Sequence, residues 1–400
     1  MKSWVEISEQ RLKENYRVLT AAAGAGISVL AVVKADAYGH DAALCAPVLA
    51  QAGAEWLGVT DAAEGALVRN ALAAAGIAAP HQPCILVMTE CLPEDAEALV
   101  RHRLTPVVST IRQMQALARY SPTPFAVHLE IDTGMSRQGV SMGQPLAAVL
   151  DWLQAHRDVV HLEGVMTHFA SAEIACSHQS AAQRGRFNEA LLQVASAGLR
   201  PEWIHAGNSS SIDNEVDAVP GLLSLARLAH TYQARAMVRT GLGLYGYCLP
   251  IEREQDYTGA APSRVAPQLT RVMTWKARII GLREVAAGAR IGYNGTFTAQ
   301  HPMRLALLPV GYADGLRREL SSTNDSRGGW VTIGGQRAPI IGRVSMNLTV
   351  VDVTALASVA IGDEVIMLGD GITAEDHARI ARTIPYEIVC AVRSSRVLKP

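Results

Sequence analysis

The pattern of apolar and polar positions divides the chain into two regions. From Ser8 to about Thr240, short apolar runs alternate with longer segments of helical periodicity. The apolar runs are Ile27–Val33, Trp56–Val59, Cys84–Met88, Thr105–Val108, Phe125–Ile131, Leu162–Met166, Trp203–His205 and Met237–Arg239. Eight strands that alternate with helices predict an α/β fold, a closed parallel (β/α)8 barrel of the TIM type, whose functional groups gather at the carboxyl ends of the strands.

Local sequence signals support helices between these runs. Leu12, Tyr16 and Leu19 recur at helical spacing, and Asp61-Ala62-Ala63-Glu64 matches a capping box for a helix that ends near Gly76. We therefore expect amphipathic helices that cover the outside of the predicted barrel.

After Gly246 the pattern becomes that of a mainly β region. A charged, proline-containing stretch is followed by β-rich runs, in the order Pro250–Pro267, Leu269–Ile280, Leu305–Pro309 and Leu348–Val353. Two further runs, Trp330–Ile333 and Arg337–Ile340, flank Gly334-Gly335-Gln336, a short connection that is typical of a hairpin. We predict a barrel domain over 8–240 and a β domain over 241–400. The N-terminal strand over 1–7 belongs to the β domain.

Composition narrows the range of partners. The 400 residues are 49% hydrophobic, which is enough for a sizeable core, and the formal net charge of -1 offers no basic surface for nucleic acid or an anionic membrane. The opening segment, 1–7, lacks the apolar length of a signal peptide or membrane span, so we expect a cytoplasmic protein. The six cysteines show no C-x-x-C spacing, which favours buried thiols over a metal site.

Lys34 is the first candidate for chemistry. The chain contains few lysines, and Lys34 directly follows the first apolar run, at the predicted mouth of the barrel. An amine attacks an aldehyde only when it is deprotonated, and a partly desolvated site among cations lowers the pKa of an amine. Position alone, however, favours an ordinary solvated lysine at a strand end.

An ordered set of short motifs changes this interpretation. The motifs are Ala31–His40, Asp132–Arg137, Thr167–Phe169, His205–Ser209, Arg239–Gly246, Tyr293–Thr296, Gly311–Gly315, Gly342–Met346 and Tyr386–Glu387. In this order, and over nearly the whole chain, they closely resemble the motifs of the alanine racemase family. The resemblance implies an isomerase that uses pyridoxal 5'-phosphate to interconvert L-alanine and D-alanine, and that supplies D-alanine for peptidoglycan.

The resemblance also assigns residues to the cofactor. Lys34 would form the covalent link, His168 would face the pyridine ring, and Arg239, with His205 behind it, would bond the ring nitrogen. The remaining cofactor residues would be Arg137 at the phenolic oxygen, with Tyr38, Ser209, Gly241, Leu242 and Tyr386 near the phosphate. A guanidinium is a poor proton donor to the ring nitrogen, so this choice of partner should suppress transamination.

Racemisation needs two proton carriers on opposite faces of a planar intermediate. By resemblance, Lys34 is one carrier, and the other is Tyr293 of the partner subunit, so that the active sites would be complete only in a homodimer. Neighbouring cations would have to ease ionisation of the phenol. Arg137, Tyr312 and Met346 would contact the substrate.

Two departures from the family leave the substrate open, and a third concerns the length of one segment. Glu130 stands where many members have a carbamylated lysine that orients Arg137, and we predict that Glu130 fixes Arg137 directly. An ion pair of Glu130 elsewhere is the alternative. Asn347 replaces a residue that is usually acidic. The stretch Asn208–Arg239 is longer than usual, and Pro220–Arg227 within it predicts a short added helix. A serine or broad-specificity racemase is therefore an alternative. A cofactor carrier would not need the β domain, and a decarboxylase would pair the pyridine nitrogen with a carboxylate instead of Arg239.

Overall fold

The computed structural model describes residues 1–121, 124–214, 221–253 and 262–399. The chain forms two compact units. The barrel unit comprises 12–37 and 42–270, and the β unit comprises 1–11, 38–41 and 271–400. Pro220 and residues 254–261 of the predicted charged stretch lie outside the described residues. The functional boundary between 8–240 and 241–400 stays a prediction.

The barrel unit confirms the predicted fold. Its parallel strands are β2 (Ile27–Val32), β3 (Trp56–Val59), β4 (Cys84–Val87), β5 (Thr105–Val108), β6 (Phe125–Asp132), β8 (Val160–Met166), β10 (Trp203–His205) and β11 (Arg235–Thr240). They run in the order β5-β4-β3-β2-β11-β10-β8-β6, and pairing of β5 with β6 closes the ring. The strand interiors are mostly buried, as expected for strands that are covered on both faces.

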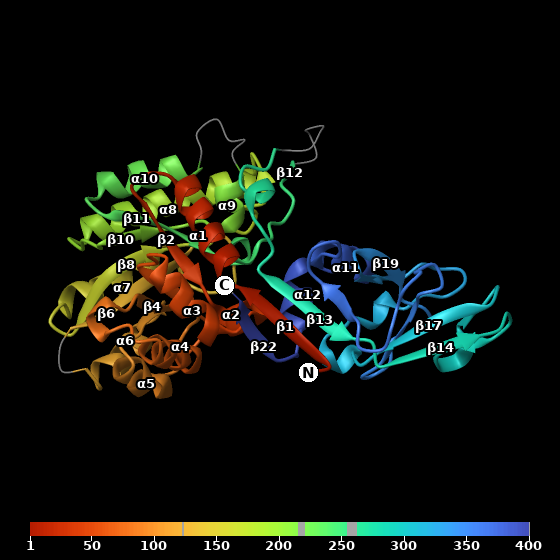
Figure 1. The fold of residues 1–400 in the computed structure, drawn as a ribbon. Coiled ribbons are helices and arrows are strands. Elements are labelled where there is room, and N and C mark those ends of the chain that lie inside the picture. Colours follow the sequence, from red (N-terminus) through yellow and green to blue (C-terminus); the bar gives the residue numbers. More distant parts are fainter. Residues whose placement is uncertain (122–123, 215–220, 254–261, 400) are drawn as a thin grey trace. The chain divides into compact units, whose positions relative to one another are not determined.

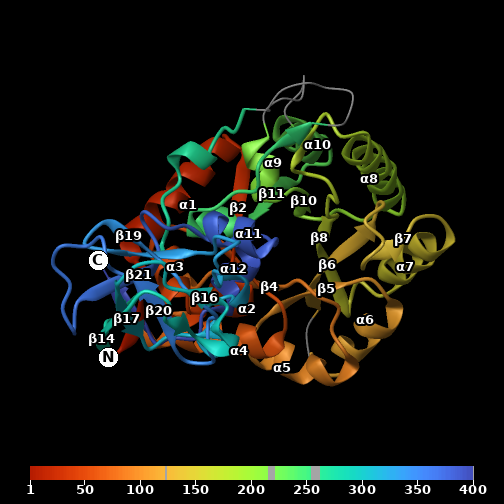
Figure 2. The same ribbon diagram turned by 90° about the vertical axis from the view of Figure 1, so that its right-hand side faces the viewer.

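Helices surround this ring of strands, as Figures 1 and 2 show. They are α1 (Glu9–Ala23), α2 (Lys34–Gly39), α3 (Ala42–Gln51), α4 (Ala62–Ala74), α5 (Ala96–Arg101), α6 (Ile111–Ala118), α7 (Gln144–Ala155), α8 (His178–Ser196), α9 (Ser209–Asp213) and α10 (Gly221–Thr231). In α1 the predicted apolar face is buried at Leu12, Tyr16 and Leu19. The short strands β7 (Val140–Ser141), β9 (Ile174–Ala175) and β12 (Glu252–Arg253) lie in the connections.

The start of α4 is capped, but only half in the predicted way. The Asp61 side chain accepts a hydrogen bond from the backbone N–H of Glu64 at 2.9 Å. The Glu64 carboxylate accepts from the backbone N–H groups of Thr60 and Ala35, each at 2.7 Å. Glu64 therefore ties the loop after β3 to the loop after β2, which carries Lys34.

The β unit contains two antiparallel or mixed sheets. The first has the order β19-β18-β21-β13-β1-β22 and the second the order β14-β17-β20. Their strands are β1 (Ser3–Ser8), β13 (Met273–Arg278), β14 (Gly281–Val285), β17 (Met303–Leu308), β18 (Trp330–Ile333), β19 (Gln336–Pro339), β20 (Thr349–Asp352), β21 (Glu364–Leu368) and β22 (Arg396–Lys399). A small hairpin of β15 (Arg290–Ile291) and β16 (Phe297–Thr298) and the helices α11 (Ala374–Ala381) and α12 (Pro385–Ala391) complete the unit.

The predicted hairpin is confirmed as β18 and β19. Ile333 pairs with Gln336, so the connection is the dipeptide Gly334-Gly335. Both glycines have positive φ, +55° and +78°, which matches the turn that suits the twist of two adjacent strands.

Two expectations from composition have structural outcomes. Cys45 and Cys91 are buried, but Cys84 and Cys176 are exposed, so the interpretation of the cysteines as buried thiols is wrong for the second pair. In the parts of the chain that the structure describes, no helix combines the length and apolarity needed to cross a membrane.

Candidate active site

Lys34 lies where the first barrel strand gives way to an unusual turn. It is half-buried, and α2, which begins with it, is left-handed: positions 35–38 have φ between +51° and +55°, and Gly39 has φ +79°. L residues lose roughly 1–2 kcal/mol each in this conformation, so surrounding contacts must hold the turn. The bond from Ala35 N–H to Glu64 is one, and the bond from Ala42 N–H to Asp36 at 2.9 Å is another.

Arg239 is the buried centre of the barrel half of the site. Its guanidinium donates to Nδ1 of His205 at 3.0 Å, to Nδ1 of His168 at 3.1 Å and to the carbonyl of Thr167 at 2.8 Å. The side chain is only 4% exposed. Burial lowers the pKa of Arg239 to about 10, a value far enough above neutrality to keep the group cationic.

His168 is neutral in this environment. Burial lowers its pKa to about 3, and the positive charges of Arg239, Arg137 and Lys34 act in the same direction. An imidazole with this pKa has a free lone pair at neutral pH, which is why Nδ1 accepts from Arg239. The structure thus brings the charges of Lys34, Arg137 and Arg239 within electrostatic range of His168.

Ser209 organises a group of polar atoms that suits an anion. Its hydroxyl accepts from the backbone N–H of Gly241 at 3.1 Å and of Gly243 at 3.3 Å, and it bonds the Thr240 hydroxyl at 3.0 Å. Leu242 begins a 3-10 helix here, over Leu242–Tyr245. A Cβ on Gly243 would lie 3.3 Å from the hydroxyls of Ser209 and Thr240, so glycine keeps the backbone close to both. Hydroxyls and convergent N–H groups are the donors that phosphate prefers.

Glu130 does not form the predicted ion pair with Arg137. It lies buried at the end of β6 and accepts a hydrogen bond from Gln138, whereas Arg137 is exposed. In the described part of the chain, the two groups interact only by Coulomb attraction. Burial raises the pKa of Glu130, and the positive charges of Arg239 and Arg137 oppose this. The shorter stem of glutamate directs the carboxylate to Gln138 instead.

The β unit holds the tyrosines and methionine that the sequence assigned to the site. The rings of Tyr38 and Tyr386 lie 5.9 Å apart, and burial raises the pKa of Tyr38 well above its usual 10. Backbone N–H groups of Tyr312 and Ala313 donate to the carbonyls of Ser345 and Met346 at 3.0 and 2.9 Å. Tyr312 and Met346 therefore lie on two loops that are bonded to each other.

Tyr293 lies at the tip of the β15–β16 hairpin and is 66% exposed. Three positive φ angles shape the tip, +73° at Gly292, +62° at Asn294 and +53° at Gly295. A side chain on Gly292 would place its Cβ 3.2 Å from the backbone nitrogen of Arg343. The hairpin thus presents the phenol of Tyr293 outward from the β unit.

Asn347, the second departure from the family, has a local partner. Its amide donates to the Asp314 carboxylate at 3.4 Å, and that carboxylate also caps the backbone N–H of Gly311 at 2.9 Å. An acidic residue at 347 would face this carboxylate with a like charge. The substitution therefore suits the loop that carries Tyr312.

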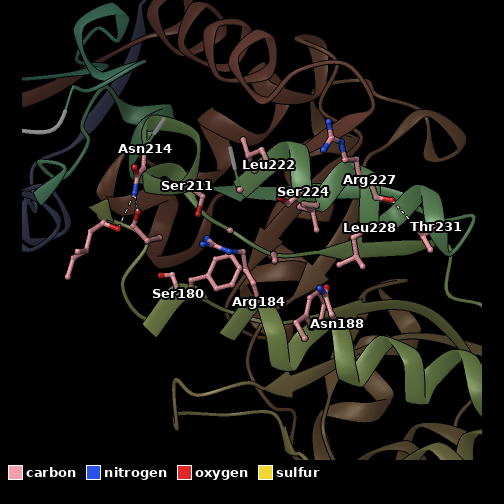
Figure 3. A pocket seen from close by; sticks show the side chains of 18 residues that line it. Ser180, Arg184, Asn188, Ser211, Asn214, Leu222, Ser224, Arg227, Leu228 and Thr231 are labelled. Carbon is pink, nitrogen blue, oxygen red and sulfur yellow. Dashed lines mark hydrogen bonds between the residues drawn. The ribbon is translucent and has the colours of Figure 1, made fainter. Parts of the chain in front are cut away.

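The segment after His205 contains α10, a helix that covers the described part of the predicted one; that it is an addition to the family stays a prediction. Figure 3 shows α10 beside α8 over a cavity of about 430 Å³. The cavity has an apolar part and a polar part, and its lining includes Phe187, Leu222, Leu228, Arg184, Arg227 and Ser211. It therefore adjoins, through Ser211 and Gly207, the same loop that carries Ser209.

Sequence reasoning missed His128 and Glu163. His128 is fully buried in β6, its Nδ1 lies 2.8 Å from Nε2 of His205, and its Nε2 lies 3.3 Å from Oε2 of Glu163. Neither residue ends a strand, and 77 positions separate His128 from His205. The one available signal was a histidine within an apolar strand run, which is more often structural.

The fold and the buried polar centre together define a class of protein: an enzyme with a (β/α)8 barrel, a lysine at the barrel mouth and a second unit made mainly of β-strands. The N-terminal domain of alanine racemase matches residues 7–249, and the C-terminal domain of alanine racemase matches residues 272–399. The chain belongs to the alanine racemase family, which confirms the resemblance.

Individual relatives span almost the entire chain. An alanine racemase of Syntrophobacter fumaroxidans is 37% identical, over 98% of this chain and 96% of the relative. The solved alanine racemase of Streptomyces coelicolor is 32% identical, with a TM-score of 0.83 over 99% and 98% of the two chains. The alanine racemase of Bartonella henselae, solved with covalently bound pyridoxal phosphate, is 25% identical, with a TM-score of 0.78 over 100% of both chains.

Proposed function

We propose that this chain interconverts L-alanine and D-alanine by a two-base mechanism, with Lys34 and Tyr293 of the partner subunit as the proton carriers. The reaction class follows from the family: the chain is an amino-acid racemase, an isomerase, and pyridoxal 5'-phosphate is its cofactor. The observation that supports the assignment of residues is the cluster of Lys34, Arg137 and Arg239 around a neutral His168.

The described residues fit the cofactor. The Ser209 hydroxyl and the N–H groups near Gly241 suit its phosphate, and the close backbone at Gly243 leaves room that a Cβ would fill. His168 would lie against the ring, and Arg239 would bond the ring nitrogen. When bound, pyridoxal phosphate withdraws electrons from the α-carbon of an amino acid and so acidifies its proton.

Each proton carrier has a distinct task. Lys34 holds the cofactor until substrate arrives and then exchanges a proton with one face of the α-carbon. Tyr293 of the partner subunit exchanges a proton with the opposite face. Arg239 keeps its own proton, because its pKa of about 10 leaves it charged at neutral pH. It would therefore bond the ring nitrogen of the cofactor without protonating it, which would limit protonation at the wrong carbon.

The exposure of Tyr293 supports a homodimer with shared active sites. A phenol that acts as a base must be shielded from bulk water, yet Tyr293 is 66% exposed in the single chain. A second copy of the chain would supply that shielding and would receive the phenol. Arg137, Tyr312, Met346 and Tyr386 would then contact the substrate or the cofactor in the completed site.

Alanine is the proposed substrate, and serine is the alternative. The Asn347 amide is bonded to Asp314 at 3.4 Å, so it has a partner other than the substrate. We further propose that the product serves peptidoglycan synthesis in the cytoplasm.

The test is a circular-dichroism assay of the purified holoenzyme with L-alanine and with L-serine, read beside the visible absorption of the bound cofactor. We expect turnover of L-alanine to exceed that of L-serine by at least tenfold, because one added hydroxyl in a fitted pocket changes binding by roughly 1–3 kcal/mol. Equal turnover of the two amino acids would identify a broad-specificity racemase instead of an alanine racemase.

A further inference from the structure

A chain of buried polar side chains runs from Arg239 into the interior of the barrel. Arg239 donates to Nδ1 of His205, Nε2 of His205 lies 2.8 Å from Nδ1 of His128, and Nε2 of His128 lies 3.3 Å from the Glu163 carboxylate. Both histidines are fully buried, and the Glu163 side chain is 18% exposed. Four polar groups in an apolar interior need a consistent set of donors and acceptors.

Only one set of donors and acceptors satisfies this chain. A guanidinium has donors and no acceptor, so Nδ1 of His205 must accept. Burial lowers the pKa of His205 well below its usual value, so the ring is neutral and its proton lies on Nε2. Nε2 of His205 then donates to Nδ1 of His128. Nδ1 of His128 must therefore accept, and the proton of that neutral ring lies on Nε2, 3.3 Å from the Glu163 carboxylate.

The surrounding backbone is adapted to hold the His128 ring in this chain. The pairing of β6 with β8 shifts register between Val127 and His128. A Cβ on Gly164 would lie 2.6 Å from the His128 ring, so only glycine leaves space for it. Trp56 packs against the other side, with ring centroids 5.1 Å apart. Sequence positions on three strands thus converge on one imidazole orientation.

We infer that Glu163 and His128 are positioning residues for Arg239. The Glu163 carboxylate, 3.3 Å from Nε2 of His128, is the acceptor that we assign to this proton; it supports the tautomers that Arg239 sets and makes Nδ1 of His205 a stronger acceptor for the guanidinium. Arg239 is thereby held in one orientation by a negative charge that does not contact it. The inference rests on the proposed function only where Arg239 is said to bond the cofactor ring.

Selective ¹⁵N labelling of histidine, read by NMR on the holoenzyme, tests the proton positions directly. We expect the Nε2–H tautomer for both His128 and His205. In Glu163→Leu, which removes the acceptor, the Nε2 signal of His128 should shift, because its proton loses its partner. In Glu163→Gln, an acceptor oxygen is retained, so this shift should be smaller. An Nδ1–H tautomer on either ring of the wild type, or unchanged His128 signals in Glu163→Leu, would overturn the inference.

Kinetics and the course of the reaction supply the second measurement. Glu163→Leu should lower kcat roughly tenfold, in the range that removal of an outer hydrogen-bond partner usually gives, and should leave KM nearly unchanged. It should also raise the ratio of transamination to racemisation, because Arg239 is less firmly held. Glu163→Gln should restore most of the kcat.

Glu14→Leu is the matched control, because Glu14 pairs with the exposed Arg17 at 2.6 Å on α1 and lies outside the chain of buried groups. It should leave kcat and the reaction ratio at wild-type values. Equal kinetic losses in Glu14→Leu and Glu163→Leu would show general destabilisation and overturn the inference. Should the wild type racemise no amino acid while both histidines carry Nε2–H, the proposed function fails and the proton arrangement stands.

Discussion

The barrel unit and the β unit prepare their functional groups in opposite ways. In the barrel unit Arg239 is 4% exposed and fully engaged with His168, His205 and Thr167. In the β unit Tyr293 and Met346 are 66% and 56% exposed. Arg239 is thus fixed within one chain, whereas Tyr293 and Met346 present open surfaces. Cofactor binding should therefore depend on the single chain, and turnover on assembly.

The largest expected effect is the loss of Lys34. Lys34→Ala removes both the link to the cofactor and one of the proton carriers, so activity should fall by roughly 10⁴-fold, the upper end for an acid–base group. Borohydride reduction of the wild type followed by peptide mapping should label Lys34. Lys276→Ala is the control, because Lys276 pairs with Glu6 at 3.0 Å in the β unit. A label on Lys276 would refute the assignment.

Tyr293→Phe tests whether turnover can be lost while cofactor binding is kept. The cofactor absorption should remain, and turnover should fall by roughly 10²–10⁴, because the phenolic oxygen is lost and the buried cluster is untouched. Proton removal from L-alanine should slow, whereas deuterium exchange from solvent into D-alanine should persist through Lys34.

Mixing two inactive variants tests whether the site is shared. Lys34→Ala combined with Tyr293→Phe should rebuild one intact site in each heterodimer and restore part of the activity. A mixture that exchanges subunits and still stays inactive would contradict the shared site.

Acid should weaken the barrel unit more than the β unit. Buried neutral His168 and His377 have pKa values lowered to about 3 and about 4, against a usual 6.5. Full stability is therefore present above pH 6.5 and declines as pH falls toward the folded pKa, by about 2 kcal/mol per histidine at pH 5. The barrel unit also buries His128 and His205, whose pKa values are lowered in the same sense.

Hydrogen exchange of the apoprotein at pH 7 and pH 5 measures this difference. Protection in the barrel strands should decrease more than protection in β13 and β21, and His377→Gln should remove the pH dependence of the β unit alone. Equal losses in the two units would show that the buried histidines do not control acid stability.

The smallest expected effect on rate is that of Glu130→Gln. The variant keeps an amide near Gln138 but removes a negative charge that acts on Arg137 and Arg239. We expect kcat to fall roughly tenfold, equivalent to about 1.4 kcal/mol, with little change in cofactor affinity. Activity should not depend on dissolved carbon dioxide. Wild-type kcat in this variant would leave the carboxylate without a role.

Patterns along the chain predicted the framework better than the contacts within it. The expected strands Trp56–Val59, Thr105–Val108 and Trp203–His205 match β3, β5 and β10 residue for residue, because buried parallel strands are continuous apolar runs. The expected run over 237–239 was too short, since β11 begins at Arg235, a polar residue exposed at the strand start.

The missed features depend on residues that are distant in sequence. The residue types of His128 and Glu163 do not predict that the two side chains lie close together, because their proximity requires β6 and β8 to pair with a shifted register. The partner of Glu130 was wrong for a related reason: the reach of a side chain depends on backbone geometry, and spacing in the sequence does not reveal it.

The left-handed turn after Lys34 has a consequence for chirality. Positions 35–38 hold L residues in the mirror image of their preferred helix, and Ala35 is exposed there with φ +51°. A D residue prefers this conformation. Glycine also adopts it without strain, but glycine increases the conformational freedom of the unfolded chain. A semisynthetic chain with D-alanine at position 35 would therefore be more stable than the natural one. The enzyme is proposed to make D-alanine, and D-alanine would suit position 35 of its own backbone better than L-alanine does.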